Sequence, residues 1–332
     1  MIDHLGGEAV AAPADRILAW AARRPQRVFG YNPWQLGAHV LHTALRHRVT
    51  GPAAEMSFFA MLTLVPLTVA VGAALGQIQR FVGPEKIARG QDAAISLVRV
   101  VISPQLTDGV VDPFVRAQLS QPQRGSAAIG GLLLTWWLAG RLFAATSRAL
   151  DTAYHDRHQR MSVAQRLIAL GFAFGSVVVV VLTLGIMVDA PFMDEQRDLA
   201  LHFGISRALA TAWYIGRWPV VLAVLVVFLL CLYRFAPSVK HAWRHLLPGA
   251  VLGVTLWILA AIGFRIYLAL GSGAPTGVVV SNAEVVLIGR AVGAVVATVL
   301  WTYFSSVAIL VGNELNAELA RMRGPDAVGQ VS

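Results

Sequence analysis

The sequence has very little cysteine and very little charge. Its one cysteine, Cys231, lies inside an apolar run, which excludes an intramolecular disulfide and a thiolate zinc site. Charged residues make up 14% of the 332 positions, against about 25% in soluble globular proteins, and 56% of the residues are hydrophobic. The mean hydropathy is +0.63. This composition predicts an integral membrane protein.

Several functional motifs are missing as well. Lys86 and Lys240 are the only lysines, so the net charge of +9 comes almost entirely from arginine, and no basic run of five or more residues occurs. Arginines that flank membrane spans explain this charge without nucleic-acid binding. The sequence contains no phosphate-binding loop and no HxHxDH-like metal motif, which argues against ATP hydrolysis and ribonuclease activity. We therefore expect no enzymatic activity, no cofactor, no bound metal and no nucleic-acid partner.

Six apolar segments are long enough to cross a bilayer, for which about 20 residues at 1.5 Å rise suffice. The predicted spans are residues 53–78, 126–150, 167–188, 215–233, 246–270 and 285–312. Pro219 and Pro248 are expected in the first turn of the fourth and fifth spans. The sequence thus predicts an all-α integral membrane protein, a bundle of six transmembrane helices that forms one domain over 53–312.

Glycine pairs four residues apart recur in the spans and permit close contact between helices. These pairs are Gly72/Gly76, Gly171/Gly175, Gly249/Gly253 and Gly289/Gly293. Four such pairs favour a tightly packed bundle.

The segments outside the spans contain amphipathic helices and most of the arginine. In the predicted cytoplasmic region 1–52, Ala14–Arg24 and Gln35–Arg48 have helical periodicity, the second with Leu36, Val40, Ala44 and Leu45 on its apolar side. Residues 85–102 form an amphipathic segment expected outside the cytoplasm. The 234–245 loop contains three basic residues and the 272–284 loop none. This bias places both termini, including the helix end and tail 313–332, in the cytoplasm.

Three arginines lie inside the predicted spans, where an isolated charge costs at least ~2.5–3.5 kcal/mol at mid-bilayer. They are Arg141, Arg265 and Arg290. Arg265 and Arg290 either extend to the outer headgroups or face a cavity and bind an anionic group, for which guanidinium is well shaped. Arg141 is deeper, and we expect it to face inward with Glu55 or Glu314 as its partner.

The sixth span continues without a break into a polar helix end. Glu314 and Glu318 are four residues apart and share a face, while Asn313 and Asn316 share a neighbouring one. The cations expected opposite the carboxylates are Arg148, Arg234, Arg244 and Arg321. Two interpretations stay open. These residues, with Glu55, either form a polar latch that ties the helix to the cytoplasmic loops or take part in proton or ion coupling.

Four segments resemble the BrkB/YihY family of bacterial inner-membrane proteins over roughly residues 40–320. The segments are Ala53–Leu67, Trp137–Tyr154 with its RALDTAY end, Leu232–Pro237 (LYRFAP) followed by Leu247–Ala250 (LPGA), and Leu310–Leu319 (LVGNELNAEL). The resemblance implies six transmembrane helices, a cytoplasmic N-terminus and a role in the cell envelope, for which lipid or envelope-component transport has been proposed. Residues 271–289 depart from the family pattern, because this loop is longer and lacks aromatic residues.

The leading functional hypothesis is a protein of the bacterial plasma (inner) membrane that binds or transports an amphipathic, anionic, lipid-like envelope component. Its partners are then membrane lipids. The alternative is a scaffold or subunit of an envelope complex that binds a protein partner or a second copy of itself. The third hypothesis is that the protein is an enzyme, which requires a metal bound at the histidine pairs His155/His158 and His241/His245.

Overall fold

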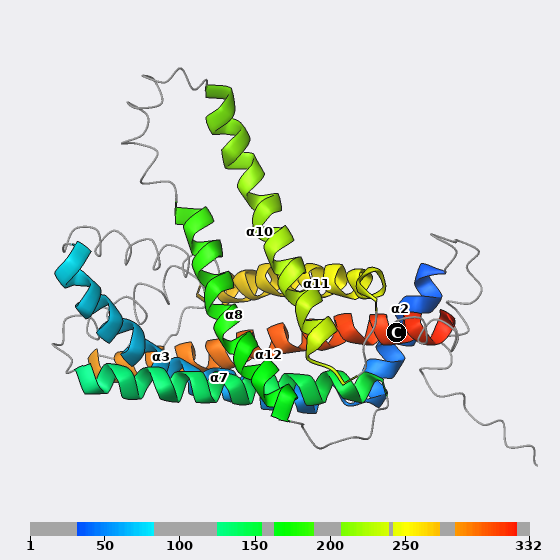
Figure 1. Ribbon diagram of the computed structural model, residues 1–332, viewed down its shortest axis with the longest axis horizontal. Coiled ribbons are helices and arrows are strands. Elements are labelled where there is room, and N and C mark those ends of the chain that lie inside the picture. The colour runs from blue at the N-terminus through cyan, green and yellow to red at the C-terminus, as the bar shows by residue number, and fades with distance from the viewer. Residues whose placement is uncertain are drawn as a thin grey trace, which may run out of the picture.

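The computed structural model describes residues 32–82, 125–154, 163–188, 207–238, 242–272 and 283–323. Within these ranges the chain is helical and contains no strand (Figure 1). The helices are α2 (Pro33–Arg46), α3 (Thr50–Val82), α7 (Gly125–Ala153), α8 (Val163–Val188), α10 (Arg207–Phe235), α11 (Trp243–Ser272) and α12 (Ala283–Arg323). The all-helical prediction is confirmed for this part of the chain. The predicted amphipathic segments Ala14–Arg24 and 85–102 lie outside it.

Five of these helices are long and apolar enough to cross a membrane by length and composition. Their candidate spans are Ile129–Ala153, Val163–Val180, Ile215–Phe235, Trp243–Tyr267 and Val295–Arg323. They overlap the second to sixth predicted spans, with bounds that differ by up to about eleven residues. The first predicted span, 53–78, lies within α3, which is not among these five candidates. The count of six membrane crossings and the side of the membrane on which each terminus lies therefore stay predictions.

Two prolines lie deeper in their helices than the sequence predicts. Pro219 is in the interior of α10, which begins at Arg207, and Pro248 is inside α11, which begins at Trp243. The helices start earlier because the more polar residues before each apolar run continue the helical turn. A proline removes one backbone donor, a loss that neighbouring groups can compensate in a packed membrane helix.

The helices form two sets that cross at a steep angle (Figure 1). In the first set, α3 packs along α7, α11 packs along α12, and α12 also contacts α3. In the second set, α8 leans on α7 and α10, and α10 contacts α11. The C-terminal end of α12 therefore lies among the ends of several other helices, with α2 against it.

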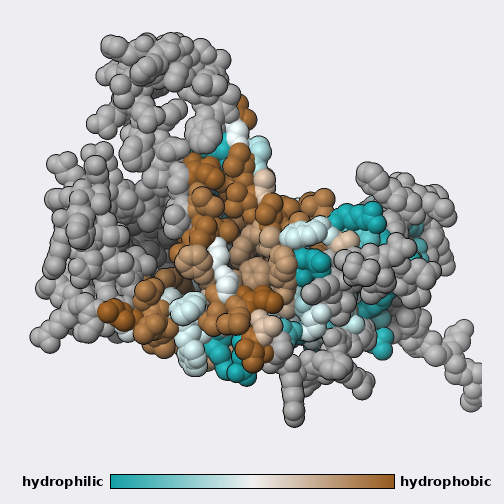
Figure 2. Space-filling model, viewed as in Figure 1, coloured by the Kyte–Doolittle hydropathy of each residue, from teal (hydrophilic) through white to brown (hydrophobic). Residues whose placement is uncertain are grey.

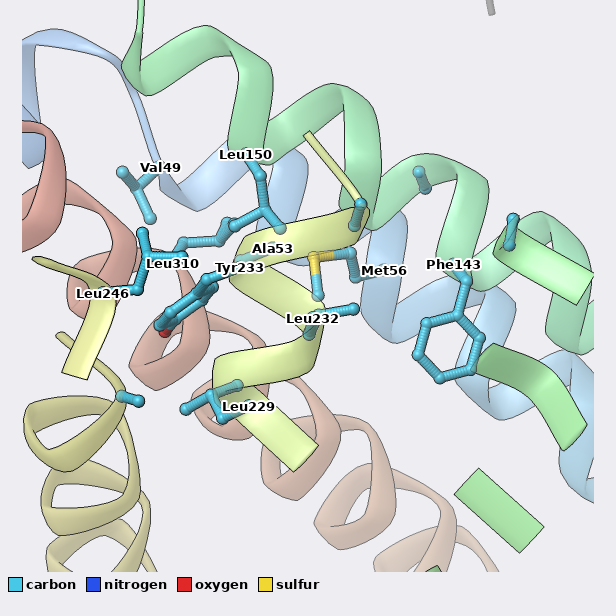
Figure 3. Packing of buried hydrophobic residues seen from close by; sticks show 14 of the residues in the cluster. Val49, Ala53, Met56, Phe143, Leu150, Leu229, Leu232, Tyr233, Leu246 and Leu310 are labelled. Atoms are coloured by element: carbon cyan, nitrogen blue, oxygen red, sulfur yellow. The ribbon is translucent and has the colours of Figure 1, made fainter. Parts of the chain in front are cut away.

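The hydrophobic core lies where helices from both sets meet near the C-terminal end of α12 (Figure 3). Leu150, Leu232, Tyr233 and Leu246 are each at most 1% exposed. They come from α7, α10 and α11, so residues distant in sequence exclude solvent together. Farther along the same interface, Phe143 stacks on Phe172 of α8, and both rings make edge-to-face contacts with Phe228 of α10, with centroids 5.8–6.4 Å apart.

Much of the outer surface is apolar. Leu132, Trp137, Phe174 and Leu259 are each more than half exposed, and Figure 2 shows hydrophobic residues gathered over the crossing of α8 and α10. Hydrophilic residues gather on the side where α2 and the end of α12 lie. Exposed apolar area on this scale is unusual for a soluble monomer but is the expected surface of helices in lipid.

Helix α2 packs one face on α12 and exposes another. Asn32 caps its start, because its side-chain oxygen accepts hydrogen bonds from the backbone N–H groups of Trp34 and Gln35. Val40 and Ala44 are buried, as the amphipathic pattern predicts. Leu45, expected on the same side, is instead 67% exposed, because α12 covers only a narrow stripe of this helix.

Candidate functional site

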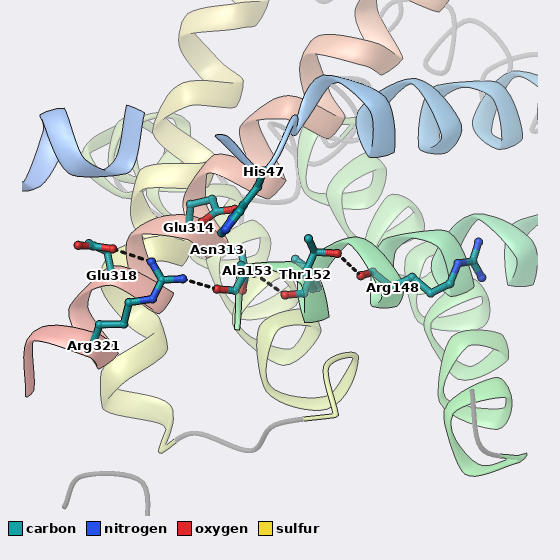
Figure 4. A network of polar contacts seen from close by, with 9 residues as sticks. His47, Arg148, Thr152, Ala153, Asn313, Glu314, Glu318 and Arg321 are labelled. Carbon is teal, nitrogen blue, oxygen red and sulfur yellow. Dashed lines mark hydrogen bonds and ion pairs between the residues drawn. The ribbon is translucent and has the colours of Figure 1, made fainter. Parts of the chain in front are cut away.

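The C-terminal end of α12 contains a group of buried polar side chains, the α12 polar cluster, made of Asn313, Glu314, Asn316 and Glu318. Figure 4 shows three of them, Asn313, Glu314 and Glu318. The exposures of the four are 1%, 3%, 2% and 9%. Buried amides and carboxylates are costly unless they are hydrogen-bonded, so each needs partners from neighbouring helices. Those partners determine what this end of the helix can do.

Asn316 joins α12 to the first turns of α11. Its Oδ1 accepts a hydrogen bond from the Gly249 N–H at 2.8 Å, and its Nδ2 donates to the Leu246 carbonyl at 3.1 Å. The backbones approach closely here, since a Cβ on Gly249 would lie 2.2 Å from the Gly312 carbonyl oxygen. Tyr233 from α10 enters the same junction and donates its hydroxyl to the Ile309 carbonyl at 2.5 Å. Three helices are thus fixed to one another at this point.

The last turn of α7 is held by two other side chains of α12. Asn313 Nδ2 donates to the Leu150 carbonyl at 3.0 Å, and Arg321 donates to the Ala153 carbonyl at 2.8 Å. The final carbonyls of a helix have no partner within the helix, so α12 supplies donors for them. Asn313 and Asn316, predicted to share one face, therefore bind different helices.

The two carboxylates of the cluster face α2 and the link that follows it. Glu314 Oε1 lies 2.8 Å from His47 Nδ1, and Glu318 Oε1 lies 3.7 Å from His39 Nδ1. Glu318 Oε2 also pairs with Arg321 at 2.9 Å, as the sequence predicts. The histidine partners were not predicted, because His47 and Glu314 are separated by 267 positions. The sequence indicates these partners only in that both histidines are polar residues of the amphipathic segment Gln35–Arg48.

A further buried carboxylate, Asp151, has a structural role that the sequence interpretation missed. Its oxygens accept hydrogen bonds from the Ser238 backbone N–H at 2.6 Å and from the Ser238 hydroxyl at 3.1 Å. Asp151 thereby ties the end of α7 to the turn that follows α10. Asp151 lies in the RALDTAY segment, which resembles the BrkB/YihY family, and this position was an indication in the sequence that the residue matters.

The expected partner of Arg141 is wrong for the described residues. Glu55 pairs with Arg148 at 2.6 Å, and Glu314 pairs with His47. The Arg141 guanidinium lies instead 5.4 Å from the centre of the Phe59 ring and 5.9 Å from that of Trp137. Arg148, about two helical turns closer to the end of α7, is the residue that pairs with Glu55.

Of the other two arginines predicted to lie within spans, the structure describes the side chain of one. Arg265 is exposed on α11 near the end of the candidate span Trp243–Tyr267. Arg290 lies in α12, and its side chain is outside the described residues. The substrate-binding set of Arg141, Arg265 and Arg290 therefore stays a prediction.

A small pocket opens beside Glu314. It is lined by His47, Val49, Pro52, Ala149, Thr152, Ala153, Leu310, Asn313 and Glu314. Close by, burial and then the charge of Glu314 raise the pKa of the Tyr154 phenol, while Arg321 lowers it, so this hydroxyl stays neutral at physiological pH. Over the described ranges, no group of three or more histidine, cysteine or acidic residues could hold a metal ion.

Comparisons with known proteins identify relatives of this chain. Residues 40–330 match the family described as virulence factor BrkB. The chain is 25% identical over 293 residues to YfkH of Bacillus subtilis (strain 168), whose name describes it as ribonuclease-like, covering 84% of this chain and 94% of that protein. It is also 25% identical over 331 residues to the UPF0761 membrane protein Smlt0865 of Stenotrophomonas maltophilia (strain K279a).

The match to the Stenotrophomonas protein covers 94% of this chain but 66% of that protein, so this chain spans about two thirds of its length. No solved structure matches the chain. The family match extends over most of the sequence, from the second half of α2 through α12, with the α12 polar cluster near its end. This chain therefore belongs to the virulence factor BrkB family and is a membrane protein.

Proposed function

We propose that this protein resides in the bacterial inner membrane, where it binds an amphipathic, anionic, lipid-like component of the envelope and moves it across or within the bilayer. The role is one of binding and transport, with no bond broken in the substrate. The observation that carries the proposal is the position of Arg141 in α7.

Arg141 lies at the midpoint of the candidate span Ile129–Ala153, with about 18 Å of helix on either side at 1.5 Å per residue. Its side chain is exposed on the surface of the bundle, and no carboxylate among the described residues pairs with it. A guanidinium at this depth is too far from either end of the span to be fully hydrated by bulk water. It therefore favours an anionic partner within the membrane.

The aromatic rings beside Arg141 compensate only part of the cost of its charge. A cation–π contact contributes about 0.5–1 kcal/mol when exposed and about 2 kcal/mol when desolvated, against at least ~2.5–3.5 kcal/mol for the charge at mid-bilayer. The rings of Phe59 and Trp137 still leave the N–H groups of the guanidinium in need of acceptors. A phosphate or carboxylate headgroup supplies them in a geometry that suits the planar fork of arginine.

Replacing Arg141 with glutamine should weaken the binding of an anionic lipid. We expect the affinity of the purified protein for phosphatidylglycerol to fall about tenfold, which corresponds to about 1.4 kcal/mol, with little change for phosphatidylcholine. Native mass spectrometry of the protein in detergent with each lipid measures this difference. A flipping assay with labelled phosphatidylglycerol in liposomes then tests movement of the lipid.

Arg265→Gln is the matched control, because Arg265 is also exposed on a spanning helix but lies near the end of its span. Its side chain can reach the headgroup region, so its loss should change phosphatidylglycerol affinity less than about threefold. Equal phosphatidylglycerol affinity in the wild type and in Arg141→Gln would contradict the proposal. That result would favour the scaffold hypothesis.

A further inference from the structure

Helix α2 has a second apolar face, and this face is exposed. Trp34, Leu41 and Leu45 lie within about 40° of one another around the helix axis, since each residue turns an α-helix by about 100°. They are 45%, 53% and 67% exposed. The stripe that packs on α12, with Val40 and Ala44, points about 100° away from them. The contact with α12 therefore does not cover these three residues, which we call the α2 outer face.

Positive charge borders the α2 outer face. Arg46 and Arg48 follow Leu45 in the chain and are both exposed. Neither forms an ion pair with another residue in the described ranges, and no aspartate or glutamate occurs between Asp15 and Glu55. Exposed tryptophan and leucine beside arginine are typical of helices that lie in the headgroup region of a membrane, where the apolar side chains enter the acyl boundary and the cations attract anionic lipids. The charge of this face thus complements an anionic lipid surface.

Helix α2 meets α12 at the level where α12 passes from apolar to polar residues (Figure 1). The apolar stretch of α12 ends at Gly312, and α2 and the link after it contact the helix beyond that point, at Glu314 and Glu318. Trp243, at the start of α11, is also exposed at this end of the bundle. Tryptophan is enriched at the boundary between membrane and water, so Trp34 and Trp243 place this boundary at the level of α2.

The same contacts determine the direction of α2. His39 and His47 are eight positions apart, about 12 Å along a helix, whereas their partners on α12 are four positions apart, about 6 Å. Helix α2 therefore crosses α12 obliquely and does not run along it. Since α12 is a candidate membrane span, a helix that crosses it at this level extends sideways along the membrane surface.

We propose that α2 is an interfacial helix whose outer face inserts among the headgroups of anionic lipids. One side of α2 then binds α12 and another binds the lipid leaflet, so the helix fixes the height of the polar end of α12 relative to the membrane. Arg46 and Arg48 hold the helix at the negatively charged surface, and Trp34, Leu41 and Leu45 enter the acyl boundary. This surface is separate from the proposed site at Arg141, which lies at mid-span in α7.

The test measures the depth of a nitroxide spin label at Leu45. Cys231→Ser first removes the one cysteine, and Leu45→Cys then takes the label in the full chain. The protein is reconstituted in vesicles of equal parts phosphatidylglycerol and phosphatidylcholine, and collisions of the label with oxygen and with a water-soluble nickel chelate are compared. We expect the label about 5–10 Å below the headgroup boundary, where oxygen reaches it and the chelate does not.

Gln35→Cys in the same background is the matched control. Gln35 lies about 80° around the helix from Leu45, on its polar side, and this variant keeps both arginines. Its label should be accessible to the nickel chelate. Equal access of the chelate to both labels would overturn the proposal. A Leu45 label shielded from both reagents would mean that protein, such as a second copy of the chain, covers the face, and would overturn it as well.

The charge of the lipid is tested in vesicles of phosphatidylcholine alone. The Leu45 label should move up to the headgroup boundary there, because the attraction of Arg46 and Arg48 to a negatively charged surface is lost. Replacing both arginines with glutamine should remove the difference between the two kinds of vesicle. Equal depth in both vesicles with the arginines in place would overturn the assignment to anionic lipids.

Two further variants keep the result unambiguous. Leu41→Cys, one turn earlier on the α2 outer face, repeats the measurement if Leu45→Cys does not fold, and its label should show the same depth. Arg141→Gln combined with the Leu45 label should leave that depth unchanged. The interfacial helix and the proposed lipid site at Arg141 can therefore fail separately.

Discussion

Replacing Gly249 with alanine should abolish the folded state or lower its stability by about 3 kcal/mol or more. The added Cβ would lie 2.2 Å from the Gly312 carbonyl oxygen and 2.4 Å from Asn316 Cγ. The first of these atoms belongs to the backbone of α12, so a rotamer change cannot relieve the clash and the two helices must separate. Overpacking alone typically costs about 1–3 kcal/mol, and separation also breaks the hydrogen bonds of Asn316.

The Tm of the detergent-purified protein and its elution profile in size-exclusion chromatography measure this effect. Gly263→Ala is the matched control, because Gly263 lies on the same helix, α11, and a Cβ there would meet nothing within 4 Å. Alanine is favoured over glycine in a helix by about 1 kcal/mol, so this variant should be as stable as the wild type or slightly more stable. Equal stability of Gly249→Ala and Gly263→Ala would contradict the packing of α11 on α12.

Asn316→Leu should give the second largest loss of stability, about 2–4 kcal/mol. Leucine has the same branched shape and the same number of side-chain heavy atoms as asparagine, but its side chain makes no hydrogen bond. The Gly249 N–H and the Leu246 carbonyl would lose their bonds to Asn316 in a site that water does not reach, where each unsatisfied group costs about 1–3 kcal/mol. The fall in Tm relative to the wild type measures the effect.

Gln165→Leu makes the same change from amide to leucine at an exposed hydrogen bond. Gln165 Nε2 donates to the Ser238 hydroxyl at 2.7 Å on the surface, where water can replace the lost partner. We expect this control to lower stability by less than about 1 kcal/mol. A loss in Asn316→Leu no larger than in Gln165→Leu would show that Asn316 does not hold α11 and α12 together.

The close contact at Gly249 illustrates how far sequence patterns reach. Four glycine pairs predict close helix contacts, and the structure shows such a contact at Gly249 and Gly253, which face α12 and α10. At Gly171 and Gly175 a Cβ would meet nothing within 4 Å. Glycine spacing marks where helices can approach closely. The partner helix determines where they do.

The polar end of α12 is a second case. Helical periodicity alone predicts that Glu314 and Glu318 share a face, and both in fact point toward histidines of α2 and the link after it. Arginines were expected opposite both, since arginine is the abundant cation of this sequence. Glu314 is paired with His47 instead, because the chain folds this link back against α12 from the other end of the sequence.

Local chemistry in the sequence determined the helical membrane fold, the positions of five spans and the continuous passage of α12 into a polar end. Each of these follows from apolar length, helical period and charge along the chain. Only the tertiary structure decided that Arg141 lies against the Phe59 ring, that Glu55 pairs with Arg148, and that Asn313 and Asn316 bind different helices. These contacts join residues more than 60 positions apart, so they depend on which helices become neighbours, and no local pattern encodes that choice.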